Sequence, residues 1–411
     1  MKSLLAVMLA WIGTWAAAPQ PPIPGTTRTF RNQTVRLIVH ASAGGARVRI
    51  RISNTFGDHP LRIGAAHIAR STTAADIDPA SDRTVKFRGQ SSTTVAARSM
   101  VVSDPIDLDV PALSNLAISL FFPEATEATT LHVMALQTNY ISIESGDSTA
   151  SANFPAGKTM RSWPFLMGVD VEAPGQAAAI VAFGSSHTDG DGSTRDRNKR
   201  FPDVLAERLQ NTGAKLGVLN EGIIGNRLLS GAAPELSQLF GRALGEAGLT
   251  RFDRDVLAQP GVKYVIVGLG INDIAFPGSF TPLSQMVSPE SLISGYRQLI
   301  RRAHRKGIRV IGATMLPFEN AFFQDPPLTF YTPEKEAVRQ KVNAWIRSSN
   351  AFDAVVDFDA VVRDPSRPTQ LLPSYDSGDH LHPNDAGYTA QANAIPLELF
   401  TREIPARAAQ R

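Results

Sequence analysis

The sequence predicts an all-β domain followed by an α/β domain of three layers, in which helices cover both faces of a parallel sheet. The length of 411 residues exceeds what one ordinary hydrophobic core holds, which favours two domains. Residues 34–150 read as short strands with turn signals between them and no amphipathic helix. From Ile180 onward, apolar strands alternate with amphipathic helices, the pattern typical of a parallel sheet.

The amino terminus has the features of a secretory signal peptide over residues 1–18. The stretch MKSLLAVMLAWIGTWAAAPQ carries one lysine, an apolar run too short to span a bilayer comfortably, and small residues at 16–18. An uncleaved anchor and a buried strand are the alternatives. No second segment is long and apolar enough to be transmembrane. We therefore expect a secreted or periplasmic protein with no stable membrane insertion after signal removal.

The all-β domain is expected over residues 25–160, as a β-sandwich that resembles a jelly roll. Two segments, VRLIVHAS at 35–42 and RVRIRIS at 47–53, alternate apolar and polar residues. The glycine-rich residues 43–46 between them predict a hairpin. In the second segment the core face carries Val48, Ile50 and Ile52, and the face expected to be wet carries Arg47, Arg49 and Arg51.

The α/β domain is expected over residues 175–405, with EAPGQ as a plausible junction before it. Its helix near 289–306 illustrates the pattern, because Ser288 can cap its start and Gly307 can end it. In open parallel sheets, ligand sites gather beyond the carboxyl ends of the strands. The loops that follow the predicted strands are therefore the place to seek chemistry. The strand segments are IVAFG, KLGVLNEG, YVIVGLG, RVIGATML and AVVDFDA.

Charge and composition exclude several classes of function. The chain has 41 basic and 38 acidic residues, a near balance without the concentrated basic field that nucleic-acid binding needs. It has no cysteine, which excludes disulfides, thiolate catalysis and thiolate metal sites. We expect no cofactor. Asp379, His380 and His382 could suggest metal ligation, but no further histidine cluster at zinc spacing completes a site.

Three strand-end loops and one late segment carry residues suited to acyl transfer. A serine is a poor nucleophile until a base takes its proton, and a histidine oriented by a carboxylate can do so near neutral pH. Backbone and amide N–H groups can stabilise the oxyanion that forms. The candidates are Ser186 in FGSSHTDG, Gly225 in NEGIIGNR, Asn272 in GLGINDI, and Asp379 with His382 in DHLHP, with the Ser186 N–H as a third oxyanion donor.

Each candidate also has an ordinary structural interpretation when taken alone. Ser186 could lie in a polar loop that closes a buried strand, and Gly225 could be a turn glycine. Asn272 could cap a helix, and His382 could be a surface histidine. The functional interpretation depends on their conjunction, because four such features on successive strand ends of one domain point to a shared site.

The four blocks, in this order, resemble the SGNH hydrolase superfamily, also called the GDSL esterase/lipase family. The resemblance covers about residues 178 to 400 and extends to secreted bacterial members with an amino-terminal β-sandwich. It implies a flavodoxin-like α/β fold, a triad of Ser186, His382 and Asp379, and an oxyanion hole of Ser186, Gly225 and Asn272. One departure stands out: the family usually reads Gly-Asp-Ser where this chain has Ser185 before the nucleophile. We expect Ser185 to accept a backbone hydrogen bond, activity to be retained and the loop to be less rigid.

The leading hypothesis is a secreted serine hydrolase that cleaves carboxylic esters through an acyl-enzyme. The runner-up is a carbohydrate O-acetyl esterase acting on polysaccharide, and a hypothesis of another class is a catalytically degenerate surface- or glycan-binding protein. The expected partner is a small-molecule ester or an acylated glycan. The aromatic stretch Pro317 to Pro333 is a candidate lining of the acyl pocket, with a loop packed on its own aromatics as the alternative; it holds Phe318, Phe322, Phe323, Phe330 and Tyr331.

Overall fold

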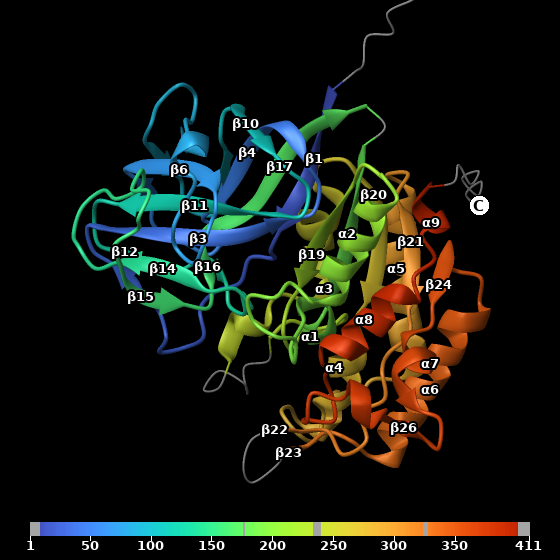
Figure 1. The fold of residues 1–411 in the computed structure, drawn as a ribbon. Coiled ribbons are helices and arrows are strands. Elements are labelled where there is room, and N and C mark those ends of the chain that lie inside the picture. Colours follow the sequence, from blue (N-terminus) through green and yellow to red (C-terminus); the bar gives the residue numbers. More distant parts are fainter. Residues whose placement is uncertain (1–8, 176, 233–239, 324–327, 402–411) are drawn as a thin grey trace, which may run out of the picture.

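The computed structural model describes residues 9–175, 177–232, 240–323 and 328–401, which form two domains side by side (Figure 1). The amino-terminal domain is all β. The carboxy-terminal domain has a parallel sheet with helices on both faces, so the predicted fold class is confirmed.

The amino-terminal domain consists of two antiparallel sheets that enclose a common core. The first has the order β1 (Leu9–Ala16), β17 (Leu166–Pro174), β4 (Gly45–Ser53) and β10 (Ile106–Val110), and β9 (Met100–Val102) also pairs with β4. The second has the order β15 (Ala156–Met160), β14 (Asn139–Ser142), β3 (Gln33–Ala41), β11 (Ser114–Phe122), β6 (Ala65–Arg70) and β7 (Arg83–Thr84). Smaller elements are the pairs β2 (Thr29–Phe30) with β12 (Thr126–Glu127), β5 (Leu61–Ile63) with β8 (Thr93–Val95) and β13 (Leu131–His132) with β16 (Trp163–Pro164), and the 3₁₀ turn η1 (Pro79–Ser81).

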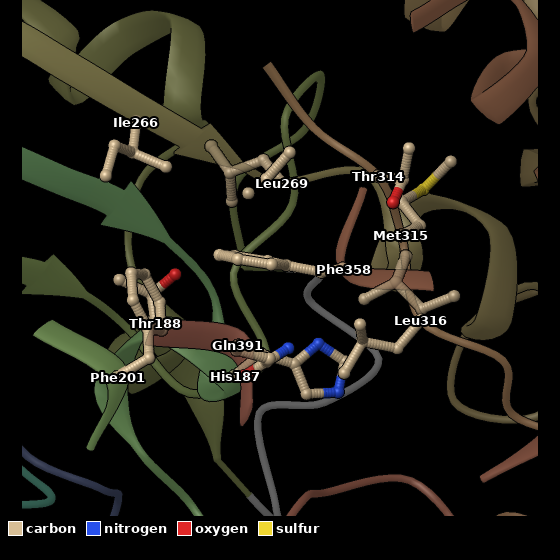
Figure 2. A pocket seen from close by; sticks show the side chains of 13 residues that line it. His187, Thr188, Phe201, Ile266, Leu269, Thr314, Met315, Leu316, Phe358 and Gln391 are labelled. Carbon is tan, nitrogen blue, oxygen red and sulfur yellow. The ribbon is translucent and has the colours of Figure 1, made fainter. Parts of the chain in front are cut away.

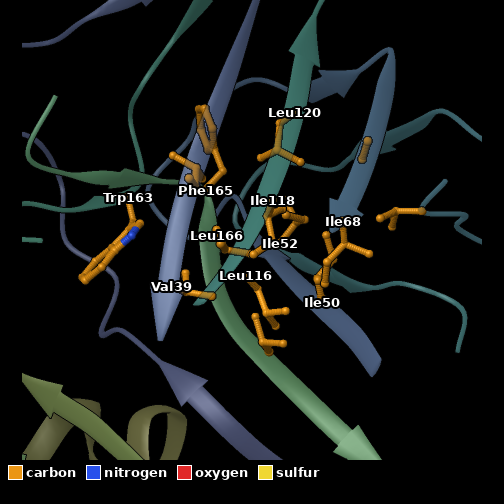
Figure 3. Packing of buried hydrophobic residues seen from close by; sticks show 14 of the residues in the cluster. Val39, Ile50, Ile52, Ile68, Leu116, Ile118, Leu120, Trp163, Phe165 and Leu166 are labelled. Atoms are coloured by element: carbon orange, nitrogen blue, oxygen red, sulfur yellow. The ribbon is translucent and has the colours of Figure 1, made fainter. Parts of the chain in front are cut away.

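Strand β4 shows how alternation builds the sandwich. Its valine and isoleucines are fully buried between the sheets, where Figure 3 shows Ile50 and Ile52 among buried side chains of the second sheet. The opposite face is not wet along its whole length as expected. Arg51 is buried, and it forms an ion pair with Asp170 of β17, which also pairs with Arg49. The arginines therefore bind the neighbouring strand instead of facing only water.

The predicted hairpin at residues 43–46 is wrong. Strand β3 lies in the second sheet and pairs with β11 and β14, whereas β4 lies in the first sheet and pairs with β17, β9 and β10. The glycines instead let the chain cross between the sheets. A Cβ on Gly44 would lie 2.7 Å from the Val110 carbonyl oxygen, and one on Gly45 would lie 2.5 Å from that of Glu172.

Residues 9–16, expected to belong to a removable signal peptide, form the edge strand β1 of the sandwich. Ile12 and Trp15 are buried in its core, and β1 pairs with β17 along its length. The strand also packs against β19 of the other domain, where a Cβ on Gly217 would lie 2.0 Å from the Gly13 carbonyl oxygen. The alternative of a buried strand therefore describes this segment, because its apolar side chains complete the core.

The sandwich consequently extends beyond the expected residues 25–160, since β1 starts at Leu9 and β17 ends at Pro174. The α/β domain starts with β18 at Ala178, close to the expected boundary. Among the described residues, no helix combines the length and the apolar character needed to cross a bilayer.

The parallel sheet has the order β19 (Leu216–Gly222), β18 (Ala178–Gly184), β20 (Val262–Gly268), β21 (Arg309–Ala313) and β24 (Ala354–Val356). This 2-1-3-4-5 order is that of flavodoxin-like folds, and it opens a crevice beyond the carboxyl ends of β18 and β20. One face packs on α2 (Phe201–Asn211), α7 (Phe358–Val362), α8 (Asp385–Asn393) and α9 (Glu398–Thr401). The other packs on α3 (Gly248–Phe252), α4 (Ile271–Ala275), α5 (Pro289–His304) and α6 (Pro333–Ser348).

Shorter elements complete the domain. The four-residue helix α1 (Ser186–Asp189) follows β18 directly. The strand pairs are β22 (Phe322–Phe323) with β23 (Leu328–Thr329) and β25 (Arg363–Asp364) with β26 (Arg367–Leu371), and the helical turns are η3 (Gly241–Leu244), η4 (Asp253–Leu257), η5 (Leu283–Gln285) and η6 (Pro373–Tyr375).

Candidate active site

Ser186 lies where β18 turns sharply into α1. Gly184 ends the strand, Ser185 has an extended backbone as the helix cap, and the helix begins at Ser186. A Cβ on Gly184 would lie only 1.9 Å from the Thr188 hydroxyl oxygen, so the turn needs glycine there. The Ser186 N–H is among the first of a helix, which have no intrahelical acceptor, and its side chain lies at the crevice.

The structure brings Ser186, His382 and Asp379 into one hydrogen-bonded chain. His382 Nε2 lies 2.8 Å from Ser186 Oγ, and His382 Nδ1 lies 2.5 Å from Asp379 Oδ2. Ser186 and His382 are buried. The imidazole can therefore donate from Nδ1 to the carboxylate and accept the serine proton at Nε2.

The loop before α8 fixes the Asp379 carboxylate. Its Oδ1 accepts the N–H groups of Leu381 at 2.9 Å and His382 at 2.8 Å, and the Ser377 hydroxyl at 3.1 Å. Burial raises the pKa of Asp379, but the hydrogen bonds and the charge of His382 outweigh it and hold the pKa well below its usual value. The carboxylate is therefore ionised at neutral pH.

A second histidine braces the loop that carries His382. The His187 ring packs edge-on against the His382 ring with the centroids 5.3 Å apart, and its Nε2 donates to the Leu381 carbonyl at 2.8 Å. Burial and the neighbouring His382 lower the pKa of His187 to about 4. His187 is therefore neutral and fixes the loop without competing for the proton.

His187 also lines a small cavity together with side chains from α2, α7, α8 and the ends of β20 and β21 (Figure 2). The cavity holds about 20 Å³. It is far too small for a substrate and lies apart from the crevice at Ser186.

The predicted oxyanion donors line the same pocket as the triad. Gly225 has a φ of 69°, and a Cβ there would lie 2.6 Å from the Leu244 side chain. Asn272 Nδ2 donates to the Asn226 carbonyl at 3.0 Å, which leaves its second N–H for a ligand. The three predicted donor groups, from Ser186, Gly225 and Asn272, therefore border one space.

Two buried side chains that the sequence did not single out hold these loops. Asp273 accepts the N–H groups of Leu228 and Leu229 at 2.7 and 2.9 Å, and burial raises its pKa to about 6. Arg251 donates to the Gly184 carbonyl at 2.9 Å and to the Asn226 side-chain oxygen at 3.0 Å. These hydrogen bonds therefore connect the end of β18 and the start of α4 to the loop that carries Gly225.

The pocket beside Ser186 measures about 230 Å³ and is mainly apolar. Its aromatic walls pack on one another, with Phe280 at the centre and its ring 5.1 to 6.3 Å from its neighbours. The buried Lys335 Nζ donates to the carbonyls of Ala275 and Phe330 and so joins two walls. The lining aromatics are Phe240, Phe276, Phe280, Phe322, Phe323 and Phe330.

The aromatic residues of the stretch 317–333 therefore fall into two groups, one that lines the pocket and one that does not. Phe322, Phe323 and Phe330 line the pocket, whereas Phe318 is in the core and packs against Tyr331.

Three side chains close to Ser186 have contacts that the sequence did not predict. The Ser185 hydroxyl is buried and has no hydrogen-bond partner, so it does not accept the expected backbone bond. Asp189 is buried and bonded to His132 of the sandwich. Asp191 lines the pocket with Oδ2 3.8 Å from His382 Nε2. Burial and inter-domain contacts of this kind leave no local sequence pattern.

His380 lies apart from the triad. It is exposed and its Nδ1 lies 2.5 Å from Asp376 Oδ2. In the part of the chain that the structure describes, no group of three or more His, Asp or Glu side chains is arranged to hold a metal ion.

A family model described as the GDSL-like Lipase/Acylhydrolase family matches residues 182–390, a span that includes all five predicted site residues. No curated protein shows significant sequence similarity to the chain. Three solved structures that resemble it each cover 53% of this chain. They are a G-D-S-L family protein from Desulfitobacterium hafniense DCB-2 (23% identity, TM-score 0.36, 97% of that chain), a GDSL-like lipase from Bacteroides thetaiotaomicron VPI-5482 (18%, 0.35, 84%) and the native aryl esterase of M. smegmatis (19%, 0.39, 95%).

Proposed function

Because the chain belongs to the GDSL-like lipase/acylhydrolase family and is therefore a hydrolase of ester bonds, we propose that it cleaves carboxylic esters through an acyl-enzyme on Ser186. The observation that supports this most is the hydrogen-bonded chain from Asp379 through His382 to Ser186 at the edge of an apolar pocket.

In the first half of the reaction, Ser186 Oγ attacks the ester carbonyl carbon while His382 Nε2 takes the hydroxyl proton. Asp379 stabilises the resulting imidazolium and keeps Nδ1 as the donor. The tetrahedral intermediate collapses, its bond to the alcohol oxygen breaks, and His382 gives the proton to the leaving alcohol.

In the second half, His382 takes a proton from water, whose oxygen attacks the acyl carbon. The bond to Ser186 Oγ then breaks, the carboxylic acid leaves, and the proton returns to Ser186. In both halves the N–H groups of Ser186 and Gly225 and the Asn272 amide stabilise the oxyanion.

The acyl group of the substrate is hydrophobic in this proposal. The pocket beside Ser186 is lined by phenylalanines, and apolar groups gain about 0.8 kcal/mol for each buried methylene. An acetyl group would leave most of the pocket's 230 Å³ unfilled. A short or medium acyl chain, or an aryl ring, fits the chemistry of these walls.

The test is hydrolysis of nitrophenyl esters from acetyl to dodecanoyl. We expect kcat/KM to rise with chain length until the pocket is filled. Ser186→Ala should lower kcat by at least about 10⁴-fold, and Asn272→Ala by about 10²- to 10³-fold. Equal, negligible turnover by wild type and Ser186→Ala would refute the proposal.

A matched pair of histidine variants locates the base. His382→Asn should abolish turnover, whereas His380→Asn changes an exposed histidine of the same loop and should leave it unchanged. Efficient release of acetate from acetylated xylan, with no gain from longer acyl chains, would instead favour a carbohydrate O-acetyl esterase.

A further inference from the structure

His132 of the sandwich reaches into the other domain beside the proposed nucleophile. It lies in β13 and is 2% exposed. Its Nε2 lies 2.9 Å from Oδ1 of Asp189, the last residue of α1, which begins at Ser186. Asp189 is 1% exposed, so this contact joins the two domains directly behind the nucleophile, away from water.

Both ring nitrogens of His132 face acceptors. Nδ1 lies 2.9 Å from the Ala18 carbonyl oxygen, and Nε2 faces the Asp189 carboxylate. Neither partner can donate when Asp189 is ionised, so the ring satisfies both only as an imidazolium. Burial and the charge of Arg200 lower the pKa of His132, but Asp189 and the Ala18 carbonyl outweigh them and raise it overall.

The second oxygen of Asp189 continues the connection to the oxyanion side of the pocket. Oδ2 accepts the N–H of Ile224 at 3.0 Å, and Ile224 precedes Gly225. The Asp189 N–H also donates to the Ser185 carbonyl at 2.9 Å. Asp189 thus connects two parts of the site: its N–H bonds the turn that presents Ser186, and its carboxylate bonds the loop that presents the Gly225 N–H.

We propose that His132 is a positioning residue through which the β-sandwich fixes Ser186 and Gly225 relative to each other. The inference rests on the proposed esterase function. In this proposal the sandwich contributes a residue that positions the active site, so it is not a separable binding module. Without the imidazolium, the buried Asp189 carboxylate loses its charge partner, which weakens the connection that Asp189 makes between α1 and the loop with Ile224.

The test compares two substitutions of His132 with a matched histidine elsewhere. His132→Leu removes both donors, whereas His132→Gln keeps an amide donor for Asp189. His67 forms a similar pair inside the sandwich, with Nδ1 2.9 Å from Asp82 Oδ2, and His67→Gln serves as the control. The readouts are kcat and KM for a nitrophenyl ester, the Tm, and hydrogen exchange of the peptides around Ser186 and Ile224.

We expect His132→Leu to lower kcat about 10- to 100-fold, as displacements near 1 Å can do, with KM changed less than about threefold. His132→Gln should recover most of kcat, and His67→Gln should keep it. Hydrogen exchange around Ile224 should rise in His132→Leu and return toward wild type in His132→Gln.

Two results would overturn the inference. One is a His132→Leu variant whose kcat and hydrogen exchange equal those of the wild type. The other is a loss of kcat that is equal in His132→Leu and His132→Gln and parallels a fall in Tm. That result would assign His132 a merely structural role. Because hydrogen exchange needs no turnover, it decides the inference even if the wild type hydrolyses no ester, an outcome that would refute only the proposed function.

Discussion

Asp191 brings a second carboxylate to the proposed base. Its Oδ2 lies 3.8 Å from His382 Nε2, the nitrogen that also bonds Ser186. Burial lowers the pKa of His382, but the hydrogen bond with Asp379 and the charges of Asp191 and Asp379 raise it above its usual value. A base must be neutral to take a proton, so activity should be lost as the pH falls through this raised pKa.

Asp191→Asn should therefore move the acid limb of the kcat/KM profile to lower pH, because it removes a charge that stabilises the imidazolium. The measurement is kcat/KM for a nitrophenyl ester across the acid range, with the exposed Asp109→Asn of the sandwich as a control that leaves the limb in place. A limb that stays fixed in Asp191→Asn, or that moves to higher pH, would contradict this electrostatic role.

Ser185 occupies the position where the family usually has aspartate, and its hydroxyl is buried without a partner. The N–H groups of Thr188 and Asp189 are bonded to the Ser185 carbonyl, not to its side chain. Ser185→Ala should therefore change kcat by less than about threefold and leave the Tm equal or higher, because an unsatisfied buried hydroxyl costs about 1 kcal/mol or more. A marked loss of kcat or Tm would show that the hydroxyl has a function that its contacts do not reveal.

The sequence predicted which residues meet at the site, because strand ends in a parallel sheet converge on one edge. Ser186, Gly225 and Asn272 follow three such strands, and the structure gathers them with Asp379 and His382 around one pocket. Their supports could not be predicted in the same way. The contact of His132 with Asp189 spans two domains, and no local periodicity carries that information.

At the scale of elements, β1 links the sandwich core to the parallel sheet. The Trp15 ring packs edge-on against Trp163 with the centroids 5.0 Å apart, and the Gly13 N–H donates to the Pro260 carbonyl at 3.0 Å. Export of the chain stays a prediction. Cleavage after Ala18 stays a prediction as well; it would remove β1 and with it the buried side chains of Ile12 and Trp15.

Removal of residues 1–18 should therefore prevent folding, as measured by circular dichroism and thermal unfolding. As a milder test, Trp15→Ala should lower the free energy of unfolding by about 3–5 kcal/mol. Trp11→Ala should cost less, since that ring is only partly buried and stacks on Arg49. Wild-type stability in the chain that lacks residues 1–18 would contradict the structural role of β1.

The separate partners of β3 and β4 show what the alternation of side chains leaves undetermined. The pattern in 47–53 identifies the core face of β4 correctly, because side chains of a strand alternate between its two faces. It does not identify the partner strand, and a glycine-rich connection serves a tight hairpin or a crossing between sheets equally well. The crossing occurs here because Gly44 and Gly45 pass close to the backbones of β10 and β17.

At the scale of the whole molecule, buried polar contacts join the two domains. Ser42 Oγ accepts the Val218 N–H at 2.9 Å, and Arg51 donates to Gln259 at 2.8 Å. Gln259 in turn donates to the buried Glu221 at 2.7 Å. The sequence indicated two domains from its change of pattern around the EAPGQ junction, but an interface of this kind has no signature in periodicity. These contacts argue for one cooperative unit.

We therefore expect calorimetry to show a single unfolding transition, with the calorimetric and van't Hoff enthalpies nearly equal. Ser42→Ala tests the coupling, because it leaves the buried Val218 N–H of β19 without its acceptor, at a cost of about 1–3 kcal/mol. The whole transition should shift to lower temperature, and Ser114→Ala, at a more exposed position in the same domain, should not shift it comparably. Two separate transitions, of which only one responds to Ser42→Ala, would mean that the domains unfold independently and that contacts such as Arg51 with Gln259 contribute little.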